Sequence, residues 1–330
     1  MNIEQIYQPI ADDLERVERL LEVSVKKSKN QSVLAMSEAL LESGGKRLRP
    51  ALVIFSEKAA SAGKKCNRDY DQLIRLATAM ELIHLASLIH DDILDGATMR
   101  RSKPSINAKL GNAASIIFGD YIYSRAFELI GKCRNPDIFE CICHAIYVMC
   151  EGELIQVCQR GDPDLSKDNY IAIVKKKTAS LFAACCHAGT IIGNHSRIVQ
   201  LTLKEFGLNF GIAFQIIDDC KDIIGKERIL GKHPGQDVAA GDMTLPLLNL
   251  LEVTGPTERC EVKRILESAT DKHSLEKIRK MFIGTNALAS TQETALYYIG
   301  RAKQELNELK DSDYKRSLDY LTDYIAQEIN

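Results

Sequence analysis

Hydrophobic positions recur with the spacing of an α-helix along most of the chain. Apolar side chains three and four residues apart predict helices of four turns or more over residues 3–27, 70–90, 108–131, 136–160, 167–192 and 199–220. The same spacing continues in shorter segments up to residue 325. We find no convincing alternation of the kind that is typical of β-strands, and the prolines stand mostly at junctions between helical segments. The pattern therefore predicts an all-α fold, a helical bundle with a large core.

Composition and charge narrow the class of protein. The 330 residues contain no linker or shift in composition, so we expect a single domain over residues 1–330. A formal net charge of −2 gives no argument for nucleic-acid binding. The 10 cysteines include no C-x-x-C pair, which favours reduced thiols over a disulfide or zinc framework. A charged amphipathic N-terminus and the lack of any run of 18 apolar residues predict neither a signal peptide nor a membrane span. These features favour a cytoplasmic protein.

Two aspartate clusters each close a long apolar run. The first reads DDILD, from Asp91 to Asp95, and the second reads DDCKD, from Asp218 to Asp222. Residues four apart share a helix face, so the outer aspartates of each cluster point the same way. Carboxylates at the end of a buried helix repel one another unless a cation lies between them. Two such ends facing one cavity would offer oxygen ligands to Mg²⁺ and, through it, to a phosphorylated ligand.

Basic residues occupy two of the non-helical segments. The segment GGKRLRP carries three cations in four residues, Lys46, Arg47 and Arg49, and we expect its final proline to end the loop. Arg100 and Arg101 follow just beyond the first aspartate cluster. Arginine suits bidentate contact with phosphate oxygens, and lysine acts as a point charge. A solvated basic loop and simple salt bridges to nearby acids are the alternatives, and the pattern alone leaves them open.

Further polar side chains stand at helical spacing from the aspartates. His84 lies seven residues before Asp91 and therefore on roughly the same helix face. A lone histidine on an apolar face is more often a core residue, but the shared face favours a ligand contact here. Gln215 precedes the second aspartate cluster by three residues, and the segment KKKTASLF contributes Lys177 and Thr178. Together they complete the polar set of a candidate site.

The successive motifs resemble those of the trans-isoprenyl diphosphate synthases, also called polyprenyl synthetases. They are GGKRLRP, ELIHxxSLIHDDxxDxxxxRR, KT, FQxxDDxxD and GKxxGxD, in the family's order. The resemblance implies an isoprenoid synthase fold, with helices surrounding a deep central cavity, and usually a homodimer. It also implies head-to-tail condensation of isopentenyl diphosphate with an allylic diphosphate, and Mg²⁺ as cofactor.

The resemblance assigns roles residue by residue. The expected metal ligands are Asp91, Asp95, Asp218 and Asp222, with Asp92 and Asp219 in support. Lys46, Arg49, His84 and Arg101 match positions that hold isopentenyl diphosphate. Arg100, Lys177, Thr178, Gln215 and Lys232 match the allylic diphosphate side. The residues expected to take part in catalysis are Asp91, Asp92, Asp95, Lys177, Thr178, Gln215, Asp218 and Asp219.

The chain departs from the family pattern at one position. After GKHPGQD the family often continues with a Gly-Lys pair before T-L-P, whereas this chain has Gly241 and Asp242. The lysine expected to help hold the allylic diphosphate is therefore missing. We expect weaker primer binding or a shifted lysine contact, without loss of function.

Product length is expected to depend on the residues below the first aspartate cluster. In the family, an aromatic residue four or five positions before the first aspartate marks short-chain enzymes, and here these positions are Ser87 and Ala86, with Ile83 deeper in the helix. One helical turn rises about 5 Å, similar to one isoprene unit. Small residues therefore predict a long product, heptaprenyl to decaprenyl, of the kind that becomes a quinone side chain. We also expect transient membrane contact on product release. The aromatic residues of the segment FGDYIYSRAF could instead block the growing chain and so set its length.

Other functions are weighed against this one. A farnesyl or geranylgeranyl synthase would carry the same motifs and make a shorter product. A class I terpene cyclase would normally carry a different second metal motif. A non-catalytic subunit of a heteromeric synthase would typically lack some of the aspartates, and all six are present here.

Overall fold

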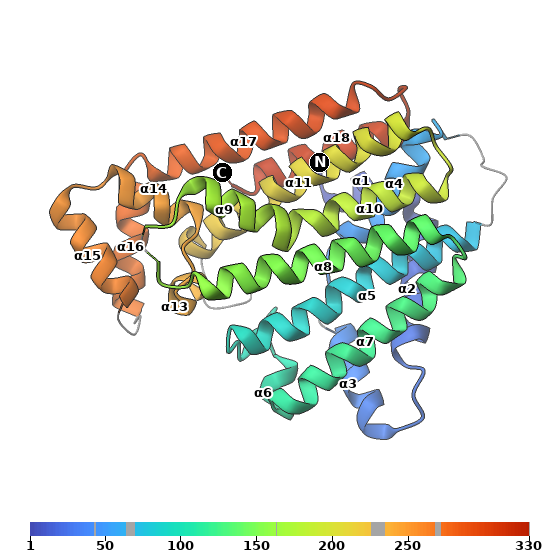
Figure 1. Cartoon of the computed structure of the whole chain (residues 1–330), viewed down its shortest axis with the longest axis horizontal. Helices are drawn as coiled ribbons and strands as arrows, with labels where there is room; N and C mark the ends of the chain where they lie inside the picture. Colours follow the sequence, from blue (N-terminus) through green and yellow to red (C-terminus); the bar gives the residue numbers. More distant parts are fainter. Residues whose placement is uncertain (43, 64–69, 163, 226–234, 268–271, 330) are drawn as a thin grey trace. The chain divides into compact units, whose positions relative to one another are not determined.

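Helices form nearly all of the regular structure that is described, as predicted (Figure 1). The computed structural model describes residues 1–42, 44–63, 70–162, 164–225, 235–267 and 272–329. Its first elements are α1 (Ile3–Tyr7), η1 (Gln8–Ile10), α2 (Ala11–Val25), α3 (Gln31–Glu42), α4 (Leu48–Ala60), α5 (Tyr70–Leu94), β1 (Met99–Arg100), β2 (Lys103–Pro104), α6 (Ile106–Leu110) and α7 (Asn112–Lys132). They are followed by α8 (Pro136–Cys158), α9 (Lys167–Val174), η2 (Lys175–Ala179), α10 (Ser180–Ile192), α11 (Arg197–Ile224), α13 (Gln236–Ala240), α14 (Leu245–Val253), α15 (Pro256–Glu267), α16 (Lys272–Gly284), α17 (Ala287–Leu306) and α18 (Asp313–Gln327).

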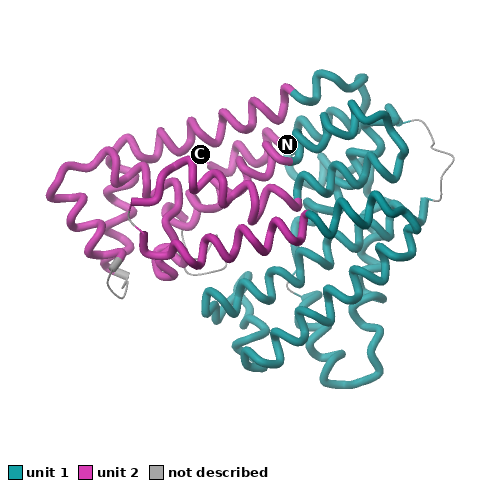
Figure 2. Tube along the Cα trace, in the orientation of Figure 1, with its two compact units in different colours: residues 1–144, 182–207, 305–321 teal, residues 145–181, 208–304, 322–330 magenta. Residues whose placement is uncertain are grey.

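The chain divides into two compact units (Figure 2). Unit 1 comprises residues 1–144, 182–207 and 305–321, and unit 2 comprises residues 145–181, 208–304 and 322–330. Each unit combines segments that are far apart in the sequence. The single domain expected over residues 1–330, and the cavity expected between the two aspartate-bearing helices, stay predictions.

Helix α5 is the core helix of unit 1. Its residues from Leu73 to Ile89 are mostly buried, because an apolar surface on all sides of a helix is stable only inside a core. It packs along α7 and also contacts α2 and α4 (Figure 1). By length and composition α5 could cross a membrane, but 72% of its most apolar window is buried inside the structure. This burial is that of a core helix, and it places the first aspartate cluster at the end of a rigid element.

The structure corrects the sequence prediction in unit 1. Helices α3 and α4 were not predicted, and α4 begins at Leu48, so Arg49 and Pro50 lie in its first turn. The expectation that Pro50 ends the loop is therefore wrong: proline fits the first turn of a helix, where its missing N–H has no intrahelical partner. A two-residue hairpin was also missed, in which Met99 pairs with Pro104. Its strands are too short to produce an alternating pattern.

Residues 3–27, expected as one helix, form α1, the 3-10 turn η1, which contains Pro9, and α2. The other helices follow the predicted ranges more closely. The segment expected as one helix over residues 167–192 is continuous, but it contains a π-helical turn at η2 between α9 and α10. Single π-turns inside α-helices occur frequently at functional sites. The segment expected to begin at residue 108 is interrupted at Gly111, whose φ of 79° ends α6 before α7 begins.

Candidate active site

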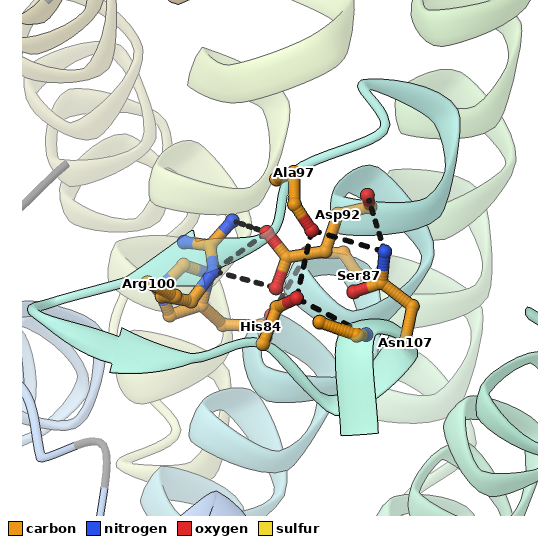
Figure 3. A network of polar contacts seen from close by, with 8 residues as sticks. His84, Ser87, Asp92, Ala97, Arg100 and Asn107 are labelled. Atoms are coloured by element: carbon orange, nitrogen blue, oxygen red, sulfur yellow. Dashed lines mark hydrogen bonds and ion pairs between the residues drawn. The ribbon is translucent and has the colours of Figure 1, made fainter. Parts of the chain in front are cut away.

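In unit 1, Asp92 orients Arg100 (Figure 3). The Arg100 Nε donates to both carboxylate oxygens of Asp92 at 2.9 Å, and Nη2 donates to Oδ1 at 2.6 Å. Burial lowers the pKa of Arg100, but the hydrogen bond and charge of Asp92 more than offset it and raise the pKa. The Asn107 amide donates to the carbonyls of Asp92 at 3.2 Å and Ala97 at 3.0 Å, which ties the end of α5 to α6. Asp92 thus has a positioning contact, and Arg100 is fixed beside the first aspartate cluster.

Positive charge gathers around His84. Burial lowers the His84 pKa well below its usual value, and the charges of Arg49, Arg100, Arg101 and Arg47 lower it further. The imidazole is therefore neutral at pH 7 and lies in a field of cations. Such a field favours an anionic ligand.

Arg49 is the buried cation of this group. It is only 9% exposed, and its Nε has no hydrogen-bond partner among the described residues. Its guanidinium lies 4.5 Å from the centre of the Phe182 ring, and none of the described carboxylates forms an ion pair with it. Burial lowers its pKa, and Cys185, Glu81 and Asp91 offset part of this effect. A buried charge that lacks its counterion is costly, so this site is short of an anion.

Lys46 and Arg101 belong to the same unit. Lys46 is exposed, and its carbonyl oxygen accepts a hydrogen bond from Tyr7 Oη at 2.9 Å. Arg101 is exposed at the tip of the hairpin, with a φ of 49°. The basic residues expected at the isopentenyl diphosphate position therefore all lie in unit 1 with His84.

In unit 2, a chain of hydrogen bonds ends on Asp219. Thr178 Oγ1 donates to Gln215 Oε1 at 2.7 Å, and Gln215 Nε2 donates to Asp219 Oδ1 at 2.6 Å. Tyr170 Oη donates to the other oxygen of Asp219 at 2.6 Å. Because Asp219 only accepts, it fixes which end of the Gln215 amide points towards Thr178. Asp219 is thus a positioning carboxylate.

The second aspartate cluster is short of positive charge. Burial raises the pKa of Asp219, hydrogen bonds from Tyr170 and Gln215 lower it, and the neighbouring carboxylates of Asp218 and Asp222 raise it again. A cation bound beside these carboxylates would relieve the repulsion. Asp218 is exposed, whereas Asp222 is buried and its Oδ2 accepts from the backbone N of Asp237 at 3.1 Å.

The carboxylates fit a metal that shares its coordination with a substrate. Within the described residues, no group of three His, Cys, Asp or Glu side chains lies close enough to hold a metal ion unaided. Protein side chains already donate to Asp92, through Arg100, and to Asp219, through Tyr170 and Gln215. Mg²⁺ is usually bound by one or two carboxylates together with substrate phosphates, so this donor set is compatible with it.

The π-turn η2 presents Lys177 and Thr178. Lys177 Nζ pairs with Glu153 Oε2 at 2.7 Å. A Cβ at Gly152 would lie 2.5 Å from the backbone N of Lys177 and 2.7 Å from Cβ of Lys176. Glycine at this position of α8 therefore allows the close approach that the π-turn requires.

Asp242 is buried and ion-paired. It is 5% exposed, and it accepts from Arg160 Nε at 2.9 Å. The departure from the family pattern has thus produced an internal ion pair in unit 2. Lys232, expected at the allylic diphosphate, lies outside the described residues.

A family comparison agrees with this set of side chains. The family model described as "Polyprenyl synthetase" matches residues 30–282. The chain belongs to the polyprenyl synthetase family. As a polyprenyl synthetase it is a prenyltransferase of the trans-polyprenyl diphosphate synthase type, and its all-α fold is that of isoprenoid synthases.

Individual polyprenyl synthetases match nearly the full chain. The octaprenyl diphosphate synthase of Escherichia coli (strain K12) is 31% identical over 318 residues, 96% of each chain. A short chain isoprenyl diphosphate synthase of Methanothermobacter thermautotrophicus is 34% identical over 334 residues, 99% of this chain and 98% of the relative. The solved polyprenyl synthase of Caulobacter crescentus, complexed with calcium and isoprenyl diphosphate, has a TM-score of 0.93 and 33% identity, and covers 98% and 97% of the two chains. Long- and short-chain enzymes are thus about equally similar to this one.

The expected chain-length residues lie on α5. Ala86 and Ile83 are fully buried, whereas Ser87 is partly exposed and its hydroxyl donates to the carbonyl of His84 at 2.9 Å. No aromatic side chain takes their place on this helix face.

The sequence did not reveal several polar partners of the site residues. Glu18 and Glu81 pair with Arg47. Glu153 pairs with Lys177, and Tyr170 donates a hydrogen bond to Asp219. Glu81 could have been found, because an acid inside an otherwise apolar helix needs a buried cation. Tyr170 gives no such signal, because a tyrosine in an amphipathic helix reads as a core residue.

Proposed function

We propose that this polyprenyl synthetase is a Mg²⁺-dependent enzyme that condenses isopentenyl diphosphate head-to-tail with an allylic diphosphate to make a long trans-polyprenyl diphosphate. The observation that carries the proposal is Arg49, a buried guanidinium without a carboxylate partner among the described residues. A diphosphate would supply the missing charge and bidentate oxygen acceptors.

The residues of unit 1 bind isopentenyl diphosphate. Lys46, Arg49 and Arg101 contribute positive charge, and neutral His84 can donate a hydrogen bond without adding further repulsion among the cations. We assign Arg100, which is held by Asp92, to the allylic diphosphate. The proposal therefore gives each basic residue either a substrate or a fixed partner.

The residues of unit 2 act on the allylic substrate. Lys177 binds its diphosphate, and the oxygens of Thr178 and Gln215 stabilise the positive charge that develops when the allylic C–O bond breaks. The hydrogen bonds from Gln215 and Tyr170 to Asp219 fix these oxygens before the reaction begins. The isopentenyl double bond then attacks the allylic carbon, and the proton lost from the new product passes to the departing diphosphate.

Asp91, Asp95, Asp218 and Asp222 are the proposed ligands of the metal. Bound Mg²⁺ would supply positive charge that stabilises the diphosphate leaving group. The raised pKa of Asp219, caused by burial and by the carboxylates of its own cluster, supports a cation at this position. The Caulobacter relative, which was solved with calcium and isoprenyl diphosphate, supports a divalent ion.

A long product is proposed because α5 has small side chains, Ser87 and Ala86, in place of an aromatic residue four and five positions before Asp91. Ala86 and Ile83 are buried without an aromatic neighbour one turn below Asp91 on α5, so a growing chain would meet no floor from this helix. We propose heptaprenyl to decaprenyl products that become quinone side chains. A farnesyl or geranylgeranyl product is the competing outcome, which the short-chain relative favours.

We also propose a cytoplasmic homodimer that contacts the membrane transiently when product leaves. Unit 1 exposes Ile116 and Ile117 on α7 and Phe139 on α8, at 47%, 69% and 49% of their surfaces. We place the contact between copies at these exposed apolar side chains. Light scattering of purified protein tests the dimer, and Ile117→Glu should shift it towards monomer.

Equilibrium binding of isopentenyl diphosphate tests the function at its central residue. Arg49 has no carboxylate partner among the described residues, so Arg49→Met removes the cost of burying an unpaired charge and should fold. We expect its dissociation constant for isopentenyl diphosphate to rise about 30-fold or more, as for the loss of a buried charged contact. Exposed Lys109→Met is the control and should bind as the wild type does. Unchanged affinity in Arg49→Met would contradict the proposed site.

A further inference from the structure

The loop between α3 and α4 has an uncommon backbone conformation. Arg47, the residue before the first turn of α4, has a φ of 52°. Side chains other than glycine adopt this left-handed conformation only when surrounding contacts hold them there. The contacts of the Arg47 side chain are therefore part of what fixes the loop, and Lys46 lies in the same loop.

Two guanidinium groups meet this loop at one point. A Cβ at Gly45 would lie 3.0 Å from Nη1 of Arg47 and 3.0 Å from Nη1 of Arg101. The carbonyl oxygen of Gly44 accepts from Nη1 of both arginines, at 3.3 Å for Arg47. Because Arg101 contacts the same two glycines as Arg47, its position depends on the conformation that Arg47 maintains.

Arg47 lies between two carboxylates from different helices. Its Nη1 donates to Glu81 Oε1 at 3.0 Å, and its Nε and Nη2 donate to the two oxygens of Glu18, at 3.2 Å for Nη2. Glu81, on α5, is 3% exposed, whereas the Glu18 side chain, on α2, is 47% exposed. The Arg47 guanidinium therefore joins α2, α5 and the loop.

The three arginines of this region differ in charge balance. Burial lowers the pKa of Arg47, but hydrogen bonds and charges from Glu18 and Glu81 outweigh it and raise the pKa. Burial lowers the pKa of Arg49, whereas partial loss of water around the exposed Arg101 guanidinium, together with the charge of Arg100, lowers the pKa of Arg101. The nearby carboxylates thus neutralise Arg47 and leave net positive charge at Arg49 and Arg101.

We propose that Glu81 and Glu18 are positioning residues for isopentenyl diphosphate. They act through Arg47, which keeps the loop in its left-handed turn and so places Lys46 and Arg101 for the diphosphate. This inference rests on the proposed function, because it assumes that isopentenyl diphosphate occupies the cluster around Arg49.

The test is steady-state elongation by Glu18→Gln and Glu81→Gln, varying each substrate in turn. Losing one charge-assisted hydrogen bond should raise the KM for isopentenyl diphosphate about tenfold, with kcat and the KM for the allylic diphosphate changed less than about twofold. The matched control is Glu15→Gln. Glu15 is on the same helix and lines the same open cleft of about 470 Å³ as Glu18, but it pairs with exposed Arg19. It should leave both KM values unchanged.

Each outcome decides the matter. Unchanged KM for isopentenyl diphosphate in both variants, or an equal rise in both KM values, would overturn the positioning role. Glu18 is exposed, so Glu18→Gln should fold. It therefore tests the positioning role even if Glu81→Gln does not fold. If the wild-type protein elongates normally and both variants have the same kinetic constants, only this inference is refuted. If the wild-type protein does not use isopentenyl diphosphate at all, the proposed function is refuted, and the positioning role with it.

Discussion

Arg160 and Asp242 form a two-point ion pair at the position where the chain departs from its family. Arg160 Nε donates to Oδ1 at 2.9 Å, and Nη2 lies 3.5 Å from Oδ2. The backbone N of Gly161 also donates to the carbonyl of Gly241 at 2.8 Å, so the end of α8 is tied to the segment before α14. Asp242 therefore has a structural role within unit 2.

Breaking this pair should cost stability. Removing one partner of a buried ion pair leaves an uncompensated charge, so Asp242→Asn should lower the free energy of unfolding by about 3 kcal/mol. Urea unfolding measures this change. The control is Asp164→Asn, which removes the partner of Lys263 from a side chain that is 85% exposed, and it should cost less than about 1 kcal/mol. Equal losses in the two variants would contradict a structural role for Asp242.

Restoring the lysine that the family often has should also be unfavourable. Asp242→Lys would place two cations side by side in a buried position, so both stability and elongation should fall. Thermal unfolding and elongation assays measure the two effects. If Asp242→Lys is as stable as the wild type and binds the allylic diphosphate more tightly, Asp242 has no structural role, and its side chain only weakens substrate binding.

Gly152 should tolerate no side chain. Gly152→Ala would place Cβ 2.5 Å from the backbone N of Lys177, so the π-turn must shift or strain. We expect a loss of about 1–3 kcal/mol in unfolding free energy and a fall in kcat of about tenfold or more. Gly300→Ala is the control, since a Cβ there meets no described atom within 4 Å, and alanine should stabilise this helix by about 0.5–1 kcal/mol. Full activity in Gly152→Ala would show that catalysis does not depend on the geometry of the π-turn.

Acid should destabilise unit 1 through His187. Burial, with the charges of Lys204 and Arg197, lowers the His187 pKa from 6.5 to about 4. The unfolded chain therefore binds a proton at a higher pH than the folded chain does. Stability from this group is complete above pH 6.5 and falls as the pH drops towards 4. Unfolding measured at pH 7 and pH 4.5 should show a smaller loss in His187→Gln than in the wild type. His273 is exposed, so His273→Gln should lose as much unfolding free energy between pH 7 and pH 4.5 as the wild type does. A smaller loss in this control would mean that the effect comes from net charge and not from His187.

The helical fold could be predicted because its elements are long and periodic. Helices α8 and α11 extend over 23 residues or more, so their helical period repeats over six turns. Helix α5 is apolar on all sides, and the length of its apolar run predicted it instead. Helix α4 was missed because its residues are buried on all sides, which removes the period. The hairpin at Met99 was missed because each of its strands has two residues.

The residue types of the candidate site could be predicted, but their partners could not. The motifs identify Asp92 and Asp219 as supporting aspartates, and the structure gives each of them specific donors. These donors come from chain positions that no local spacing connects: Tyr170 is 49 residues from Asp219, and Glu81 is 34 residues from Arg47. Contacts of this kind depend on tertiary packing.

Product length should depend on Ala86. A phenyl ring about one turn below Asp91 would block the path of the growing chain beside α5, so Ala86→Phe should give a shorter main product. Each helical turn of about 5 Å corresponds to roughly one isoprene unit. Chromatographic sizing of products from the same primer measures this shift. Ala86 is fully buried, so retained elongation activity is required to show that the variant folds. If the variant is active and its product is unchanged, the residue that stops the growing chain lies on another helix.

Elongation by the purified protein tests the central claim most directly. The assay contains Mg²⁺, labelled isopentenyl diphosphate and, separately, dimethylallyl, geranyl, farnesyl or geranylgeranyl diphosphate, with products sized by chromatography. We predict a heptaprenyl to decaprenyl product that disappears when a chelator removes the metal and returns when Mg²⁺ is restored. An active enzyme that stops at farnesyl or geranylgeranyl would contradict the long-chain proposal. No elongation from any primer would contradict the proposed function and favour a non-catalytic subunit of a heteromeric synthase.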